Sequence, residues 1–240
     1  MPLLSIQDLA IRFGPKGTKP VVDGVSFSVE PGEVVALVGE SGSGKTLIGK
    51  SLIRLLPGSA HIDRGTAMFE DKGGAVDLLN LRPAELRKIR GARVSMIFQE
   101  PMSALSPLHT VGAQVAEVLH VHGHPPGETV KGLVLSIFNE VGFPSPERAW
   151  SAYPFELSGG LRQRAVIAMA MVANPALVIA DEPTTALDVT TQAMVLDLLN
   201  RLRRSHNSAV ILITHDLGVV ANMADKVIVL RKGRIVEMGS

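Results

Sequence analysis

The 240-residue sequence contains no cysteine, which excludes disulfides, thiolate zinc sites and iron–sulfur clusters and fits a reducing cytosol. Its net charge is only +1, so the bulk charge gives no reason to expect nucleic acid or an anionic membrane surface as a partner. The longest apolar run begins at Ala165 and is interrupted by Asn174 and Pro175, well short of a membrane span. The first residues show no basic leader, so we expect a soluble chain without a signal peptide.

The best-defined motif is a glycine-rich loop between a predicted buried strand, 34–38, and a predicted helix, 47–56. It fits the pattern G-x-x-x-x-G-K-[ST] at every constrained position, with the residues Gly39, Glu40, Ser41, Gly42, Ser43, Gly44, Lys45 and Thr46. The glycines let backbone N–H groups converge on phosphate oxygens, Lys45 adds a positive charge, and the Thr46 hydroxyl can ligate Mg²⁺. The alternative is a chance turn before a helix, but the consistent flanks favour a nucleoside triphosphate site.

The rest of the chain predicts an α/β domain with a helical insert. Alternating apolar and polar residues in 1–33 favour antiparallel strands, and this periodicity alone makes Phe13 a core residue, although it could also be an aromatic near the site. Amphipathic helices without a strong strand are expected in 100–156. We expect turn-rich, mixed structure at 57–93, buried strands at 94–98, 176–180 and 210–214, and a hairpin at 227–236. The mean hydropathy of +0.25 favours a well-buried parallel sheet or an apolar face for a partner.

Polar residues follow three of the predicted buried strands: Gln99, the pair Asp181 and Glu182, and His215. Ligands gather at the carboxyl edge of parallel α/β sheets, so these residues are candidates for a site. Asp181 suits Mg²⁺, Glu182 could polarise an attacking water, and His215 could contact a phosphate. The alternatives are an acidic helix start after a strand and a structural histidine.

A second candidate anion site precedes a helix predicted to run to Asn174. Ser158 is a plausible N-cap, and Gly159 and Gly160 let backbone N–H groups face an anion. A serine cap followed by glycines also serves ordinary turns, so this signal is modest when taken alone.

His120, His122 and His124 have a spacing that suggests a metal site at first sight. A spacing of two residues places side chains on one face only in a strand, and this stretch ends in a Gly- and Pro-containing loop. We therefore expect solvent-exposed loop histidines instead of metal ligands.

Taken in the order in which they occur along the chain, these motifs resemble those of the ATP-binding subunit of an ABC transporter, over essentially the whole chain. Gln99 is similar to the glutamine of the Q-loop, and His215 to the switch histidine. The signature motif is matched by 157–164, with Leu161 where glutamine is commoner. The remaining correspondences are Walker B at 177–182, the D-loop at Ala186, Leu187 and Asp188, and Phe13 at the aromatic that stacks on adenine, where tyrosine is more usual.

The resemblance implies an α/β fold: a P-loop NTPase (RecA-like) core with an N-terminal antiparallel β subdomain and a helical ABC-specific subdomain. The whole chain, 1–240, would form a single nucleotide-binding domain. Its core and β subdomain would comprise 1–99 and 165–240, and its helical subdomain about 100–164.

The resemblance also implies ATP and Mg²⁺ as cofactors and a site shared by two chains. Two such domains would pair head to tail as a homo- or heterodimer, with Ser158, Gly159 and Gly160 of one chain capping the γ-phosphate held by the other. Glu182 would be the general base, while Gln99 and His215 would sense the γ-phosphate. Thr46, Gln99 and Asp181 would form the Mg²⁺ site, and Asp188 would contact nucleotide.

The implied partners are integral-membrane permease subunits, a second ATP-binding subunit and, indirectly, an extracytoplasmic solute-binding protein, with no nucleic acid. The chain would lie as a peripheral protein on the cytoplasmic face of the inner membrane. The runs 98–107, 40–45 and 54–57 are similar to those of the dipeptide/oligopeptide/nickel uptake subfamily. This implies an ATPase that energises the uptake of peptides or a related small solute.

Two other classes remain to be weighed. A soluble ABC-type ATPase acting on DNA or ribosomes would be expected to show a heptad-rich insert, a second nucleotide domain or a basic stripe, and the sequence shows none of these. A small-molecule kinase on a phosphate-loop fold would leave the signature helix and the placement of Glu182 unexplained.

Overall fold

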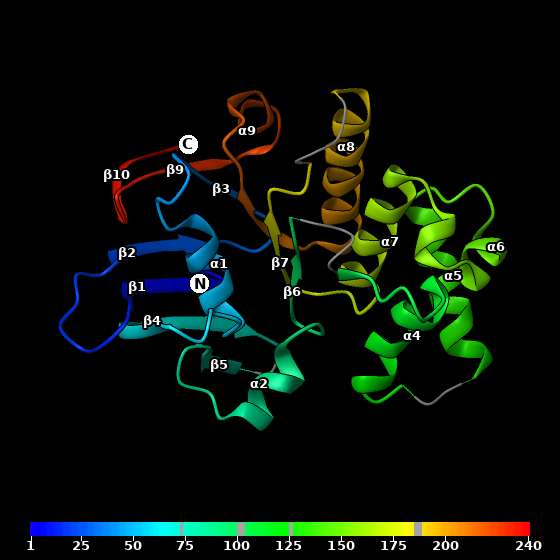
Figure 1. Cartoon of the computed structure of the whole chain (residues 1–240), viewed down its shortest axis with the longest axis horizontal. Helices are drawn as coiled ribbons and strands as arrows, with labels where there is room; N and C mark the ends of the chain where they lie inside the picture. Colours follow the sequence, from blue (N-terminus) through cyan, green and yellow to red (C-terminus); the bar gives the residue numbers. More distant parts are fainter. Residues whose placement is uncertain (73, 100–103, 125–126, 185–188) are drawn as a thin grey trace. The chain divides into compact units, whose positions relative to one another are not determined.

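The computed structural model describes residues 1–72, 74–99, 104–124, 127–184 and 189–240 (Figure 1). The chain divides into two compact units, the first formed by 1–90 with 207–240 and the second by 91–206. The helical subdomain predicted at about 100–164 falls within the second unit, and its boundaries stay a prediction. Among the described residues, no helix combines the length and the apolar character needed to cross a membrane.

The first unit contains a four-stranded antiparallel sheet in the order β2-β1-β4-β5. Its strands are β1 (Leu4–Phe13), β2 (Val22–Val29), β4 (Ala60–Asp71) and β5 (Gly74–Asp77). The predicted period of two is confirmed in β2, where Val25, Phe27 and Val29 are buried. It is wrong in β1, where Leu9, Ala10 and Ile11 are all buried at a shift in register. The expectation of turn-rich, mixed structure at 57–93 is wrong in part, because β4 pairs along its length with β1 and lies inside the sheet.

The same unit holds the strand that leads into the phosphate loop. This strand, β3 (Val34–Gly39), pairs in parallel with β8 (Ala209–Ile213) and β9 (Lys226–Arg231), and β10 (Arg234–Gly239) pairs antiparallel with β9. The helices are α1 (Lys45–Leu52), α2 (Pro83–Ile89) and α9 (Leu217–Met223). Ala36 and Val38 of β3 pack against Val220 of α9. The continuous apolar runs therefore form buried strands, as predicted.

The second unit contains two parallel strands and a group of helices. Its strands β6 (Val94–Ile97) and β7 (Leu177–Asp181) pair in parallel and are fully buried. The helices are α4 (Val111–Val121), α5 (Glu128–Glu140), α6 (Pro146–Ser151), the 3₁₀ turn η1 (Pro154–Glu156), α7 (Gly159–Met171) and α8 (Val189–His206). Helices α4 to α7 pack on one another, as Figure 1 shows. The prediction of a helical segment after 100 is confirmed.

Candidate nucleotide-binding site

The phosphate loop has a backbone that only glycine can follow at two positions. Gly39 has φ 149°, and a Cβ there would lie 2.1 Å from the carbonyl oxygen of Leu230 in β9. Gly44 has φ 102°, and a Cβ there would lie 2.7 Å from Cγ2 of Val22 in β2. Both ends of the loop are therefore in close contact with neighbouring strands, which leaves no room for a side chain. This is the local reason for the glycine pattern.

The polar groups inside the loop suit a phosphate ligand. Lys45 is only 6% exposed, and its Nζ donates to the carbonyl oxygens of Gly39 and Glu40 at 2.8 and 2.9 Å. The hydroxyl of Ser43 is buried and, within the described part of the chain, has no hydrogen-bond partner. A buried hydroxyl without a partner costs free energy, and a phosphate oxygen would satisfy it. The residues present therefore fit a nucleoside phosphate, and Thr46 lies in the first turn of α1.

Gln99 and Glu182 meet at the carboxyl end of the paired strands β6 and β7. Ile97 of β6 pairs with Ala180 of β7. Gln99 and Glu182 each lie two positions further along, so both reach the same edge of the sheet. There Nε2 of Gln99 donates to Oε2 of Glu182 at 2.9 Å, although the two residues are 83 positions apart. The expectation that these side chains share an edge is confirmed.

The backbone at Glu182 is unusual. Its φ is 47°, in the left-handed region that residues with a Cβ rarely adopt, and such a conformation costs about 1–3 kcal/mol unless the surroundings hold it. Asp181, the last residue of β7, is 3% exposed, whereas Glu182 is half-buried. Strained backbone of this kind is concentrated at functional sites, which agrees with the predicted role of this strand end.

The predicted N-cap of the signature helix is confirmed. The Ser158 side chain accepts a hydrogen bond from the backbone N–H of Leu161, and α7 begins at Gly159. Among the described residues, a Cβ at Gly159 would meet nothing within 4 Å, and one at Gly160 would make only ordinary contact with Thr191. The described side chains therefore leave space beside the start of α7.

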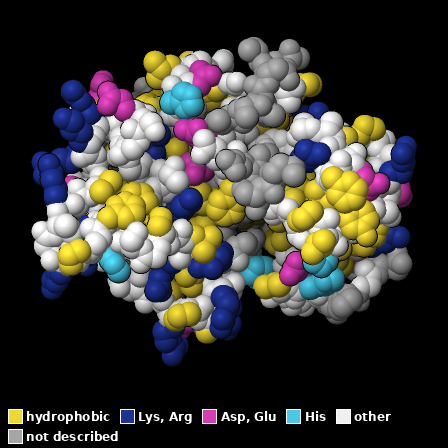
Figure 2. Space-filling model, viewed as in Figure 1, with side chains coloured by type: hydrophobic (Ala, Val, Ile, Leu, Met, Phe, Trp, Pro, Cys, Tyr) yellow, Lys and Arg dark blue, Asp and Glu magenta, His cyan; other side chains and the backbone are white. Residues whose placement is uncertain are grey.

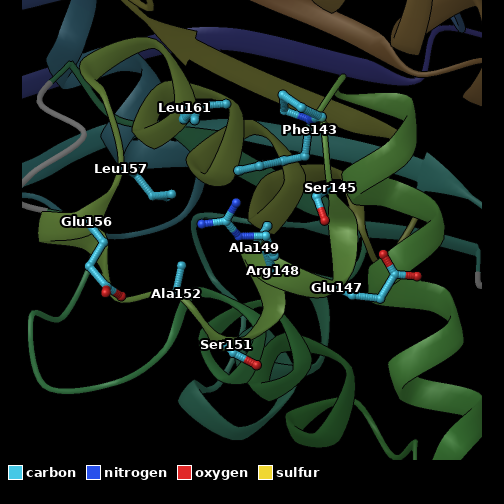
Figure 3. Close-up of a pocket in the computed structure, with 11 residues that line it drawn as sticks. Phe143, Ser145, Glu147, Arg148, Ala149, Ser151, Ala152, Glu156, Leu157 and Leu161 are labelled. Atoms are coloured by element: carbon cyan, nitrogen blue, oxygen red, sulfur yellow. The ribbon is translucent and has the colours of Figure 1, made fainter.

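A pocket of about 630 Å³ lies beside the start of α7 (Figure 3). Leu157 and Leu161 contribute apolar surface from the signature segment, while Glu147 and Arg148 contribute charged side chains from α6. None of the predicted nucleotide-binding residues lines it. The pocket is thus a feature of the helical region and not part of the predicted nucleotide site.

Phe13 and His215 belong to the first unit, together with the phosphate loop. Phe13 ends β1, pairs with Ala60 of β4 and is 37% exposed, whereas Ile11 in the same strand is fully buried. A core position is therefore wrong for Phe13, which is exposed at the end of β1. His215 is exposed and follows β8, as predicted, just before Asp216 caps α9.

The structure does not describe the predicted D-loop, and it corrects the prediction for the three histidines. Asp188 lies outside the described residues, together with the rest of the predicted D-loop. His120 is in the last turn of α4 and not in a loop, and His122 is the C-cap of that helix. In the described part of the chain, no three His, Asp or Glu residues are close enough to hold a metal ion.

The sequence alone did not single out Gln163. This residue lies in α7, is 1% exposed, and donates through Nε2 to the carbonyl oxygen of Pro183 at 2.6 Å. The sequence did contain a hint: Gln163 lies just before the small and apolar residues that begin at Ala165, and these residues are buried in the helix.

A family model described as ABC transporter matches residues 22–185. The chain belongs to the ABC transporter family. It is 49% identical to the peptidoglycan transport ATP-binding protein YejF of Agrobacterium fabrum and 46% identical to the oligopeptide transport ATP-binding protein OppD of Bacillus subtilis. The alignments cover 100% and 99% of this chain but only 43% and 66% of those proteins, so the chain spans about half to two thirds of their length.

Solved structures show the same fold. The dimeric post-hydrolysis state of the ATP-binding cassette MJ0796 bound to ADP and Pi matches with a TM-score of 0.83 at 27% identity, over 99% of this chain and 98% of that one. The protein cbiO1 from Clostridium perfringens, part of the ABC transporter complex cbiONQ, matches with a TM-score of 0.81 at 24% identity, over 99% of this chain and 88% of that one. The predicted α/β fold of an ABC ATPase cassette is confirmed.

Proposed function

We propose that this chain is the ATP-hydrolysing subunit of an ABC importer that takes up peptides or a related small solute. The observation that carries the proposal is the phosphate loop, whose glycines fit tightly and whose buried Ser43 hydroxyl has no partner among the described residues. The transport of peptides is supported by the relatives, which include the dipeptide transport ATP-binding protein DppD of Bacillus subtilis at 48% identity over 99% of this chain and 70% of that protein.

The phosphates and the adenine would be bound by groups of the first unit. The loop N–H groups, the Ser43 hydroxyl and Lys45 would hold the phosphates, and the exposed face of Phe13 would stack on the adenine. Thr46, Gln99 and Asp181 have the oxygen donors that suit Mg²⁺, which would neutralise charge on the phosphates. Binding the phosphates requires Lys45 to turn from the loop carbonyls toward the ligand.

Hydrolysis would use Glu182 as the general base. Its carboxylate would take a proton from the attacking water, and the hydrogen bond from Gln99 orients that carboxylate. His215 would contact the γ-phosphate. A carboxylate whose backbone and side chain are both constrained is suited to this role, because a general base must stay within hydrogen-bond reach of the proton it removes.

The complete site would form between two chains. Ser158, Gly159 and Gly160 of one chain would cap the γ-phosphate held by the phosphate loop of the other, with Asp188 contributing to nucleotide contact. The start of α7 supports this arrangement, because an added Cβ at Gly159 would meet no described atom within 4 Å and this end of the helix carries the positive end of its dipole. The second chain could be identical or a related ATP-binding subunit.

The partners of this pair would be integral-membrane permease subunits, served by an extracytoplasmic solute-binding protein. The chain would then lie on the cytoplasmic face of the membrane. Figure 2 shows hydrophobic side chains gathered over helices α4 to α6. Just before α7, the exposed rings of Tyr153 and Phe155 stack with centroids 5.4 Å apart, and Phe155 is 64% exposed. Exposed apolar surface of this kind supports docking to a protein partner.

The test is a mild-detergent pull-down of the tagged full-length protein from membranes of its own cell, with partners identified by mass spectrometry. We expect a polytopic permease and a second ATP-binding subunit. A mock pull-down from cells expressing the untagged protein provides the control. Recovery of only ribosomal or DNA-bound proteins would contradict the proposal and favour a soluble ABC-type ATPase.

A further inference from the structure

A hydrogen bond joins the signature helix to the backbone that carries Glu182. Gln163 lies in the second turn of α7, and its Nε2 donates to the carbonyl oxygen of Pro183 at 2.6 Å. Both residues are buried, with the Gln163 side chain only 1% exposed. The contact therefore forms away from water, where a hydrogen bond is strong and where losing the donor would leave the carbonyl unsatisfied.

Pro183 transmits this anchoring to its neighbour. The proline ring restricts φ, so holding the Pro183 carbonyl limits the peptide planes on both sides of the ring. Glu182, which precedes it, has φ 47° and is also restricted by the following proline. Such a backbone persists only when the surrounding structure holds it, and the Gln163 amide provides one of the bonds that does so.

The Glu182 side chain is constrained from a different element. Gln99, which follows β6, donates to Oε2 of Glu182 at 2.9 Å. The backbone beside Glu182 is thus tied to α7, and its carboxylate is tied to the end of β6. A general base needs this kind of double support, because a misplacement of about 1 Å can cost about 100-fold in rate.

We infer that Gln163 is a positioning residue that couples the signature helix to the orientation of Glu182. The inference rests on the proposed function, in which Glu182 is the general base and the start of α7 caps a phosphate held by the partner chain. A shift of α7 on engaging that phosphate would move the Gln163 amide and, with it, the Pro183 carbonyl. Capping in one site would then adjust the base of the other site.

A purely structural role makes a different prediction. If Gln163 only satisfied a buried carbonyl, its loss would lower the free energy of unfolding and would leave the turnover of the folded protein unchanged. If it positions Glu182, its loss lowers kcat while the affinity for ATP, set by the phosphate loop, stays the same. Measuring kcat, the affinity for ATP and the free energy of unfolding in the same variant therefore separates the two roles.

The test compares Gln163→Met with a matched buried glutamine in the full-length protein. Methionine keeps the length of the side chain and removes the donor. We expect kcat for ATP hydrolysis to fall by about tenfold or more, with the KM for ATP within about twofold of wild type. The control is Gln114→Met, because Gln114 is also buried and donates through Nε2 to the carbonyl oxygens of Ser106 and His109, both at 2.9 Å. It should lower Tm without this loss of kcat.

A second comparison tests whether the effect passes through Glu182. In a Glu182→Gln background, single-turnover rates should show little further loss from Gln163→Met, because residues that act as a unit are not additive. Fully multiplicative losses would overturn the inference, as would a wild-type kcat in folded Gln163→Met.

If that variant does not fold, Gln163→Asn keeps an amide but is too short to reach Pro183, and the same fall in kcat is expected. A wild-type protein without ATPase activity would overturn the proposed function itself.

Discussion

The ammonium group of Lys45 donates to the carbonyl oxygen of Gly39 at 2.8 Å, so a hydrogen bond links the two ends of the phosphate loop. The same group reaches the carbonyl oxygen of Glu40 at 2.9 Å. These two carbonyl dipoles stabilise a charge on a side chain that is 6% exposed. A phosphate carries a full negative charge and would therefore compete well for this group.

Replacing Lys45 by alanine should abolish most of the nucleotide affinity. A charge-assisted hydrogen bond contributes about 1.5–3 kcal/mol, so we expect the Kd for ATP to rise by about 10- to 150-fold, measured by isothermal titration calorimetry. Lys50→Ala is the control, because Lys50 lies in the last turn of the same helix and the same charge is removed. An unchanged affinity in Lys45→Ala would remove the basis for the nucleotide site.

Glu182→Gln should separate nucleotide binding from hydrolysis. The amide keeps the size of the side chain but cannot act as a base, so ATP binding should persist while phosphate release falls to a slow residual rate. We expect an ATP-dependent dimer of this variant in size-exclusion chromatography with light scattering. Adding Lys45→Ala to the variant should abolish the dimer. A protein that binds ATP yet stays monomeric would contradict a site shared between two chains in the isolated subunit.

Gly39→Ala should destabilise the protein through the fit of the loop against β9. The new methyl group would lie 2.1 Å from the backbone carbonyl of Leu230, which cannot rotate away, and φ at this position is 149°. We expect a loss of about 2 kcal/mol or more in the free energy of unfolding, measured by urea denaturation.

Gly132→Ala is the matched comparison, because a Cβ at Gly132 in α5 would meet no described atom within 4 Å. Alanine is the better helix former, so this variant should gain up to about 1 kcal/mol. Equal changes in the free energy of unfolding for the two substitutions would show that contact with β9 does not cause the loss of stability in Gly39→Ala.

Asp23 should make stability depend on pH. The guanidinium groups of Arg234 and Arg64 hold the pKa of Asp23 below its ordinary value of 3.8, with contacts of 2.6 and 2.9 Å. A carboxyl whose pKa is lowered by folding contributes stability above pH 3.8, and that contribution is lost as the pH falls through the lowered value. The Tm of Asp23→Asn should therefore lie below that of wild type at pH 7.

The difference in Tm between wild type and Asp23→Asn should stay constant down to about pH 4 and then shrink toward zero in stronger acid. High salt should also reduce it, because the Arg64 and Arg234 side chains are exposed and the attraction is screened. Thermal unfolding followed by circular dichroism from pH 2 to pH 7 measures both effects. A difference that persists unchanged at the lowest pH would show that the ion pairs do not cause it.

Prediction from the sequence failed most clearly at β4. Only Ala60, Ala67 and Phe69 of this strand are buried, so its apolar pattern is sparse. Charged residues interrupt the pattern, and two of them form ion pairs across the sheet: Asp63 with Arg12, and Arg64 with Asp23. The strand forms because it completes the hydrogen bonds of β1, a partner distant in the chain.

Local sequence was enough where a structure depends on neighbours along the chain. The phosphate loop from Gly39, the strand before it and the Ser158 cap follow from glycine conformations, a continuous apolar run and an N-cap side chain. Only the tertiary structure decided that Gln99 meets Glu182 and that Gln163 holds the Pro183 carbonyl. The register of β6 on β7 and the packing of α7 set these contacts, and both depend on residues far apart in sequence.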